Sequence, residues 1–166
     1  MSDPEGFEVF LREQSPRLLH TAWMLTGSRD VGEDLLQESL AKAYAHWDRI
    51  ETNPAGWVRT TMVRLQSAWW RRKWRGEVPT QHLPESRCSP DAGVEDRQVL
   101  SRALARLPLV QRQVVVLRYG EDLSIDEVAR LTGRSVGTVK SQSSRGLAEL
   151  RTLLTEQELK EGAEHA

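Results

Sequence analysis

Cations and flat aromatic rings are interleaved in residues 57–76. The segment holds six Lys or Arg residues and no acid, so it carries +6, and four of the six tryptophans of the chain lie within it. Cationic side chains can bind phosphate oxygens, while indole rings can stack on unpaired bases, a contact worth about 1–3 kcal/mol per base. This chemistry suits a single strand of nucleic acid. The candidate residues for it are Arg64, Trp70, Arg71, Arg72, Lys73 and Arg75, with Trp69 and Trp74 as further rings that could stack.

A second cationic segment, residues 130–151, carries +4. It follows a capping box, in which Ser124 accepts from a backbone N–H and Glu127 returns a bond to the cap. Gly133 can take the positive φ of a tight turn, and Ser135 can cap a second helix. The pattern predicts a helix-turn-helix.

The second helix of this motif has two contrasting faces. Its buried face is predicted to comprise Val136, Val139, Ser143, Leu147 and Leu150. The opposite face is small, polar or cationic, so it could enter a DNA major groove and donate hydrogen bonds there. Its members are Gly137, Thr138, Lys140, Ser141, Ser144 and Arg145. A structural helical hairpin with an incidental basic face is the alternative.

The charge of the whole chain hides these two segments. The chain has 23 Lys and Arg against 24 Asp and Glu, a formal charge of −1. Once the +6 and the +4 are set aside, the remainder carries −11. Two cationic segments in an anionic chain are typical of a protein with two nucleic-acid contacts. Solvated helix faces can carry such charge runs as well.

Three helices must position the first segment. Apolar residues recur at helical spacing in residues 7–25, 31–47 and 57–69. Gly27 is predicted to end the first helix, Asp30 to cap the second and Pro54 to begin the third. The apolar stripe of the second helix includes Tyr44. The tryptophans expected to pack inward are Trp23, Trp47 and at least one of Trp57 and Trp69.

Helices are also predicted in the second half of the chain. A short helix over residues 99–107 ends near Pro108. Residues 114–117, all Val or Leu, could form a strand, but their neighbours keep a helical phase and no partner strand exists, so we interpret them as helix. The fold class is therefore all-α, with two small helical domains at residues 1–76 and 95–155. A flexible linker, residues 77–94, is indicated by its prolines and polar side chains, and residues 156–166 are expected to be a frayed tail.

Composition excludes several classes of protein. No uncharged run approaches the roughly 18 residues that a membrane span needs, and the N-terminus lacks the basic and apolar regions of a signal peptide. One cysteine, Cys88, cannot form an internal disulfide, which favours a cytoplasmic protein. His82 and Cys88 make no metal-ligand pattern, and no nucleophile–base pair is visible. We expect no catalytic residues, no metal and no cofactor.

An acidic stripe lies on the second helix. Asp34, Gln37, Glu38 and Ala41 follow one another at i, i+3, i+4 and i+7, which places them on one face. Such a stripe is suited to docking against a basic partner helix. An ordinary solvated face is the alternative.

The motifs together resemble extracytoplasmic-function sigma factors of the sigma-70 family, in the sigma-E-like subgroup. Region 4 of that family is resembled by Leu104-Ala105-Arg106-Leu107-Pro108, Gln111-Arg112, Leu117-Arg118-Tyr119, Glu121-Asp122-Leu123-Ser124, Glu127-Val128-Ala129 and Ser135-Val136-Gly137-Thr138-Val139-Lys140-Ser141. Region 2 is resembled by Glu33-Asp34-Leu35-Leu36-Gln37-Glu38, Ala41-Lys42-Ala43, Trp57 and Trp69-Trp70-Arg71-Arg72. The resemblance covers nearly the whole chain, in the family's order.

The resemblance implies a promoter-specificity subunit of RNA polymerase that initiates transcription. Its partners would be promoter DNA, polymerase core through the β′ clamp and β flap, and an anti-sigma factor where one exists. Asp34, Gln37 and Glu38 would bind the polymerase, and the helix from Val136 would read the −35 element. The helix of residues 57–75 would melt the −10 element, and the linker would pass through the active-site cleft.

The resemblance also implies that the loop before the third helix captures a flipped −10 base. The matching candidates are Arg49, Thr52 and Asn53. Arg64 departs from the family, because many members have Asn there, and its charge favours a phosphate contact instead.

Two other functions remain open on sequence. A helix-turn-helix repressor or activator that works without polymerase explains residues 124–151 equally well, but it leaves the Trp/Arg segment and the acidic stripe without a role. A membrane-surface anchor would use the basic face of the Trp/Arg helix, although the chain has no lipidation motif and no membrane insertion is expected.

Overall fold

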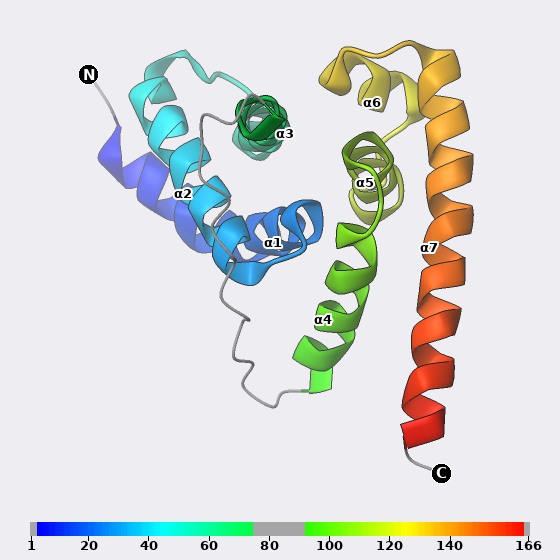
Figure 1. Cartoon of the computed structure of the whole chain (residues 1–166). Coiled ribbons are helices and arrows are strands. Elements are labelled where there is room, and N and C mark those ends of the chain that lie inside the picture. Colours follow the sequence, from blue (N-terminus) through cyan, green and yellow to red (C-terminus); the bar gives the residue numbers. More distant parts are fainter. Residues whose placement is uncertain (1–2, 75–91, 165–166) are drawn as a thin grey trace. The chain divides into compact units, whose positions relative to one another are not determined.

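Helices are the only regular elements in residues 3–74 and 92–164, which are the residues that the computed structural model describes (Figure 1). The predicted all-α class is confirmed. The chain divides into two compact units, Met1–Ser86 and Arg87–Ala166. Arg75 and most of the predicted linker, with His82 and Cys88, lie outside the described residues.

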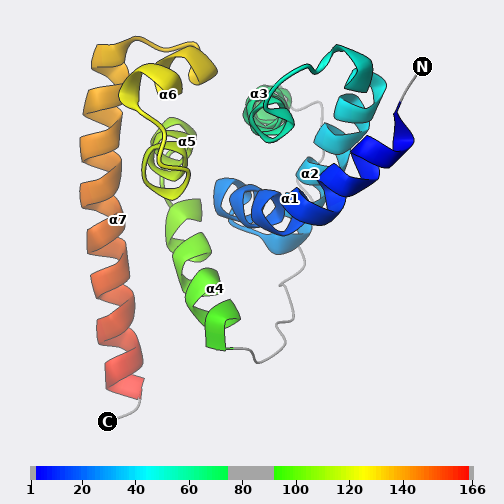
Figure 2. The same cartoon turned by 180° about the vertical axis from the view of Figure 1, so that it is seen from behind.

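The first unit is built from three long helices and one short turn. They are α1 (Pro4–Thr26), α2 (Arg29–Ala45), the 3₁₀ turn η1 (Trp47–Arg49) and α3 (Pro54–Trp74). Figure 2 shows α1 and α2 side by side, and α3 packs against both of them. Their shared core includes Ala22, Leu25, Leu35, Val58 and Met62, which are almost inaccessible to solvent.

A glycine sets the spacing of α1 and α2. A Cβ atom added to Gly32 would lie 2.8 Å from the backbone nitrogen of Trp23, which is closer than real Cβ contacts come. The absence of a side chain therefore lets the two backbones approach, and this approach buries Leu35 and Ala22 against each other's helices.

Local signals place the ends of these helices. Gly27 ends α1 with φ 78°, and Pro54 begins α3, as predicted. The predicted cap of α2 is wrong: Ser28, not Asp30, occupies the cap, with its Oγ accepting from the amide of Val31 at 3.4 Å. Asp30 lies in the first turn instead, where its carboxylate still favours the positive end of the helix dipole.

The aromatic residues of the first unit separate into core and surface. Trp23 is buried, and Trp47 is half-buried with its ring 5.2 Å from that of Phe7. Trp57 and Trp69 are also half-buried. Tyr44 was predicted to face inward but is 46% exposed, because only one side of its ring packs on Phe7, at 5.1 Å.

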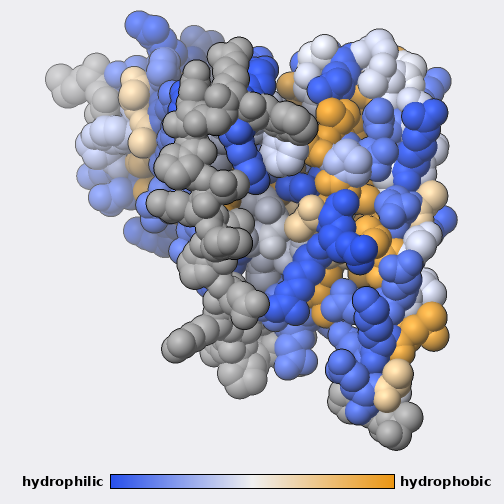
Figure 3. All heavy atoms as spheres, viewed as in Figure 1, coloured by the Kyte–Doolittle hydropathy of each residue, from blue (hydrophilic) through white to orange (hydrophobic). Residues whose placement is uncertain are grey.

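The second unit contains four α-helices and a π turn. They are α4 (Ala92–Ala105), α5 (Leu109–Val115), the π turn η2 (Val116–Gly120), α6 (Ile125–Thr132) and α7 (Val136–Glu164). The helical interpretation of residues 114–117 is confirmed. The longest helix, α7, packs against α4, α5 and α6. Figure 3 shows apolar side chains along the seam between α7 and the α4–α5 pair.

A buried arginine joins α5 to the end of α4. Arg112 donates from Nε to the carbonyl of Leu104 at 2.9 Å, and from Nη2 to the carbonyls of Ala105 at 3.0 Å and Leu107 at 3.1 Å. These carbonyls belong to the last turn of α4 and the residues after it, where helical partners run out. Burial lowers the pKa of Arg112 from its ordinary value, because desolvation disfavours the charged form. An arginine nevertheless stays protonated in proteins, so Arg112 is a permanent C-terminal cap.

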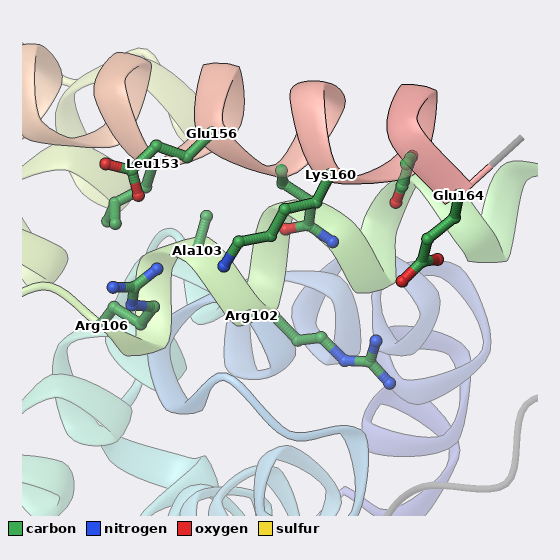
Figure 4. A pocket seen from close by; sticks show the side chains of 9 residues that line it. Arg102, Ala103, Arg106, Leu153, Glu156, Lys160 and Glu164 are labelled. Carbon is green, nitrogen blue, oxygen red and sulfur yellow. The ribbon is translucent and has the colours of Figure 1, made fainter. Parts of the chain in front are cut away.

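The predicted frayed tail is instead the last part of a helix. The helix α7 continues through residues 156–164 and runs beside α4 (Figure 4), although every side chain in this part except that of Gln157 is exposed. A groove of about 330 Å³ lies between the two helices. Arg102 lines it from α4 and Arg106 from the turn just after α4, while Leu153, Glu156 and Lys160 line it from α7.

Candidate nucleic-acid interface

Hydroxyl caps and one glycine build the turn between α6 and α7. Ser124 accepts at Oγ from the amide of Glu127 at 3.1 Å, and Ser135 accepts from the amide of Thr138 at 3.1 Å. Gly133 has φ 70°, in the left-handed region that favours glycine. The predicted caps at Ser124 and Ser135 and the turn residue Gly133 are therefore confirmed, the capping box in the bond that Ser124 accepts.

The face of α7 assigned to DNA is accessible. Gly137, Lys140, Ser141, Ser144 and Arg145 are exposed, and Thr138 is half-buried. Val139, Ser143 and Leu150 are buried on the opposite side, as predicted.

Two positions on the predicted buried face of α7 differ from expectation: Val136 is exposed and Leu147 is only half-buried. Val136 was expected to be buried but is 39% exposed, since it is the first residue of the helix and projects beyond the body of the unit. Gly146 is buried as well, although it was not among the residues predicted to be buried. A Cβ atom there would lie 2.7 Å from Cγ2 of Val115, so this glycine lets α7 approach α5.

Gly137 has no packing reason to be glycine. A Cβ atom added to it would meet nothing within 4 Å, although glycine in an exposed helical position costs about 0.5–1 kcal/mol relative to alanine. Gly137 leaves the exposed first turn of α7 without a side chain, which gives a partner such as a DNA strand room to approach the helix backbone.

We predict opposite effects of Gly137→Ala on stability and on DNA binding. The variant should raise the free energy of unfolding by about 0.5–1 kcal/mol and weaken binding of the chain to duplex DNA. Gly162→Ala is the matched control, because Gly162 also lies exposed in α7 with nothing within 4 Å of an added Cβ atom. Denaturant unfolding should show equal stabilisation in both variants. Titration with duplex DNA should show weaker binding for Gly137→Ala alone. Equal DNA affinity in the two variants would contradict the prediction.

The end of α3 carries the exposed part of the Trp/Arg segment. Arg71, Arg72 and Lys73 are exposed, and Trp70 is 38% exposed with Nζ of Lys73 at 5.6 Å from its ring centroid. Cations and a partly uncovered indole thus occur together, which is the combination that phosphate binding and base stacking need. Arg64 is exposed two turns earlier on the same helix.

The predicted −10 residues form two groups rather than one. Arg49, Thr52 and Asn53 are exposed just before α3 begins. The 21 residues of α3 make it about 30 Å long, so the cations of its last turn lie far from this loop. No single nucleotide can contact both groups.

A shallow pocket adjoins the first group. Its volume is about 390 Å³, and Asn53 lines it together with Phe10, Gln14, Trp47 and Pro54. Asn53 has φ 49°, and its Oδ1 accepts from the amide of Gly56 at 3.1 Å, so the side chain caps α3 as well as reaching the pocket.

The acidic stripe of α2 is exposed along its length. Asp34, Gln37, Glu38 and Ala41 all lie in solvent, in agreement with the predicted face. Glu33, which directly precedes Asp34, pairs with Arg29 at 3.4 Å.

The described residues place no metal-binding chemistry near these surfaces. Among residues 3–74 and 92–164, no group of three His, Cys, Asp or Glu side chains could hold a metal ion. Within the same residues, no helix combines the length and apolar character that crossing a membrane requires.

Sequence interpretation gave no role to Tyr119, which lies beside the helix-turn-helix. It is 50% exposed, and its hydroxyl accepts from Oγ of Ser143 on α7 at 3.1 Å. No sequence pattern could have indicated this residue, because its hydroxyl contacts a residue of another helix that lies far away in the sequence.

Known proteins match the chain in two consecutive blocks. The family model for sigma-70 region 2 matches residues 10–76, and the model for sigma-70 region 4 matches residues 97–150. The RNA polymerase sigma-E factor of Streptomyces coelicolor is 40% identical over 163 residues, which make up 96% of this chain and 92% of that protein. The RNA polymerase sigma factor SigV of Bacillus subtilis is 29% identical over 144 residues, or 83% of this chain and 84% of that protein.

One solved structure is similar over the same span. The sigma factor RpoE from Bartonella quintana, in its co-crystal structure with the anti-sigma factor NepR, superposes with a TM-score of 0.73 and 26% identity. The superposition covers 91% of this chain and 98% of that one.

Proposed function

Because this chain belongs to the sigma-70 family, as an extracytoplasmic-function sigma factor with regions 2 and 4, we propose that each of its two units reads one promoter element. A sigma factor is a non-enzymatic initiation factor that binds RNA polymerase core and DNA and confers promoter-specific transcription. What remains to be assigned is which residues of this chain perform each step. The observation that carries the assignment is that two exposed cationic surfaces, one slim and one bearing an indole, lie on separate units.

The slim surface is assigned to the −35 duplex. Gly137 and Ser141 leave room for α7 to enter the major groove, while Lys140 and Arg145 flank them with cations. A guanidinium or ammonium group can donate to a guanine edge or to a phosphate. Direct base reading by Arg145 would make substitution there relax the sequence preference at one position.

The indole-bearing surface is assigned to the −10 strand once it is open. Trp70 would stack on a base while Arg71, Arg72 and Lys73 bind the phosphates beside it.

The pocket at Asn53 is assigned separately, to one base flipped out of the duplex. Its volume of about 390 Å³ falls in the range of small-molecule sites, and Trp47 offers it an aromatic wall.

The acidic stripe of α2 is assigned to the β′ clamp of the core enzyme. Asp34 and Glu38 are exposed one turn apart, and a basic helix could lie along both. The β flap is assigned to the groove between α4 and α7 (Figure 4). Helical periodicity puts Leu153 of this groove on the opposite side of α7 from Gly137, so flap and DNA could be bound together.

An anti-sigma factor is a further proposed partner. The support is that the matched RpoE structure is a complex with the anti-sigma factor NepR. We place this chain in the cytoplasm, where RNA polymerase core transcribes the chromosome.

Reconstitution with core polymerase tests the proposed function. Core plus the full chain should initiate from a promoter that core alone ignores, and Asp34→Lys with Glu38→Lys should weaken core binding at least roughly tenfold, because like charges would then face each other. Glu5→Lys with Glu8→Lys on α1 is the control, because it makes the same change of charge at two exposed positions outside the stripe. Core binding that resists the double substitution would remove the stripe from the interface. Failure of the wild-type chain to bind core would contradict the proposal that its two units read two promoter elements as part of RNA polymerase.

A further inference from the structure

A tyrosine is held at the surface beside α7 by contacts on two sides. The hydroxyl of Tyr119 accepts from Oγ of Ser143 at 3.1 Å, and the guanidinium carbon of Arg118 lies 5.7 Å from the ring centroid. Arg118 is itself fixed, since Nη1 donates to the carbonyl of Leu123 at 3.1 Å. Tyr119 is therefore ordered although half of it is exposed.

The backbone around Tyr119 is unusual. In the π turn η2, the amide of Glu121 donates to the carbonyl of Val116, five residues earlier, at 3.0 Å. Such turns are rare in helices and occur frequently at functional sites. Here the turn brings the ring to α7 instead of into the core formed by Val116 and Leu117.

The hydroxyl of Tyr119 lies at one edge of the DNA-facing surface. Ser143 is three residues after Lys140, so it is about 60° around the helix from it. Ser143 is buried and Lys140 is exposed, which makes Ser143 the boundary between the packed and the open side. A group bonded to Ser143 from outside the core thus stands next to the side chains assigned to the −35 duplex.

A phenol has one proton to donate and lone pairs that accept. When Ser143 donates to the oxygen, the proton of Tyr119 is left for another acceptor. Phosphate oxygens accept hydrogen bonds from tyrosine in many protein–DNA interfaces, and such contacts fix the orientation of the protein.

We propose that Tyr119 donates its hydroxyl proton to a phosphate of the −35 duplex, with Ser143 holding the ring in place. The contact is neutral and belongs to no cationic segment. It would fix the angle at which α7 enters the groove. This proposal rests on the assignment of α7 to the −35 element.

The test compares Tyr119→Phe with Ser143→Ala in holoenzyme made from core polymerase and the full chain. The probe is a promoter duplex selected from a random library by the wild-type holoenzyme. Tyr119→Phe should weaken binding about fivefold, the effect of one neutral hydrogen bond. The slope of log affinity against log salt should not change, because no counterion is displaced by a phenol. Ser143→Ala, which leaves the phenol in place, should have a smaller effect.

Single methylphosphonate linkages identify the phosphate. At one position the neutral linkage should weaken wild-type binding and leave the Tyr119→Phe variant unaffected. If Tyr119→Phe binds like wild type, or if no linkage cancels its effect, the proposal is wrong, and in the second case the ring only positions α7. A wild-type holoenzyme that shows no preference for a −35 sequence would instead overturn the underlying assignment.

Discussion

Replacing Arg112 with methionine is expected to destabilise the second unit by about 3 kcal/mol and leave the first unit unchanged. The substitution keeps much of the apolar stem but removes all three hydrogen bonds to the carbonyls of Leu104, Ala105 and Leu107. A buried acceptor that loses its donor costs about 1–3 kcal/mol, and partial rehydration at the end of α4 lowers the sum. The stability of Arg112→Lys should lie between that of the wild type and that of Arg112→Met, because an ammonium group cannot span three carbonyls as the planar guanidinium does.

The distribution of tryptophan makes this measurement direct. All six tryptophans lie at positions 23–74, within the first unit. Tryptophan fluorescence in urea therefore follows the unfolding of the first unit alone, while far-UV circular dichroism follows both. Arg112→Met should shift only the transition seen by circular dichroism. Arg106→Met is the control, since Arg106 is exposed and surface substitutions usually change stability by less than about 0.5 kcal/mol. An equal shift of both transitions would contradict the separate stability of the two units.

Local chemistry explains which parts of the fold the sequence could predict. The turn at Gly133 and the cap at Ser135 depend on residues within one helical turn of each other, and both are where the pattern placed them. The accessible face of α7 also follows from the sequence, because polar and apolar residues alternate with helical periodicity over several turns.

Tertiary packing explains what the sequence could not predict. Arg112 lies between Gln111 and Gln113 in a polar run that predicts exposure, yet it is buried. Its guanidinium packs against the end of α4 because the carbonyls there lack helical partners. Tyr44 has the periodicity of a core residue and is exposed because too little of the first unit covers it. The helical end of α7 shows no apolar stripe, and its Glu, Gln, Leu, Lys and Ala residues instead favour a helix by their intrinsic propensity.

The candidate site was predicted in its residue types and only partly in its geometry. Trp69 and Trp70 are adjacent in sequence, and only the structure shows that Trp70 is the more exposed. The separation of Asn53 from Arg71 follows from the length of α3, which the sequence indicated by Pro54 at its start and a helical pattern up to the Trp/Arg segment. The two proposed contacts, base capture and phosphate binding, therefore lie at opposite ends of one helix.

Neutralising the last turn of α3 is expected to weaken the hold on the open −10 strand about 100-fold at 0.1 M salt. Each phosphate contact to a single strand contributes about 0.7 to the slope of log affinity against log salt, so three lost contacts remove a slope of about 2. The triple variant is Arg71→Gln, Arg72→Gln and Lys73→Gln. It should destabilise the first unit by about 1 kcal/mol, because each of the three exposed cations contributes only about 0.3 kcal/mol through the helix dipole once salt screens it.

Trp70→Ala separates stacking from charge at the same place. Loss of a stacked base costs about 1–3 kcal/mol, but the salt slope should remain that of wild type because no cation is removed. Open-complex lifetime of the holoenzyme, measured over a range of salt concentrations, distinguishes the two variants. Arg49→Gln, just before the other end of α3, should shorten the lifetime and lower the salt slope by no more than the share of one phosphate contact, about 0.7. If Trp70→Ala changes the slope as the triple variant does, the ring only supports the cations through Lys73, and base stacking must be assigned to another residue.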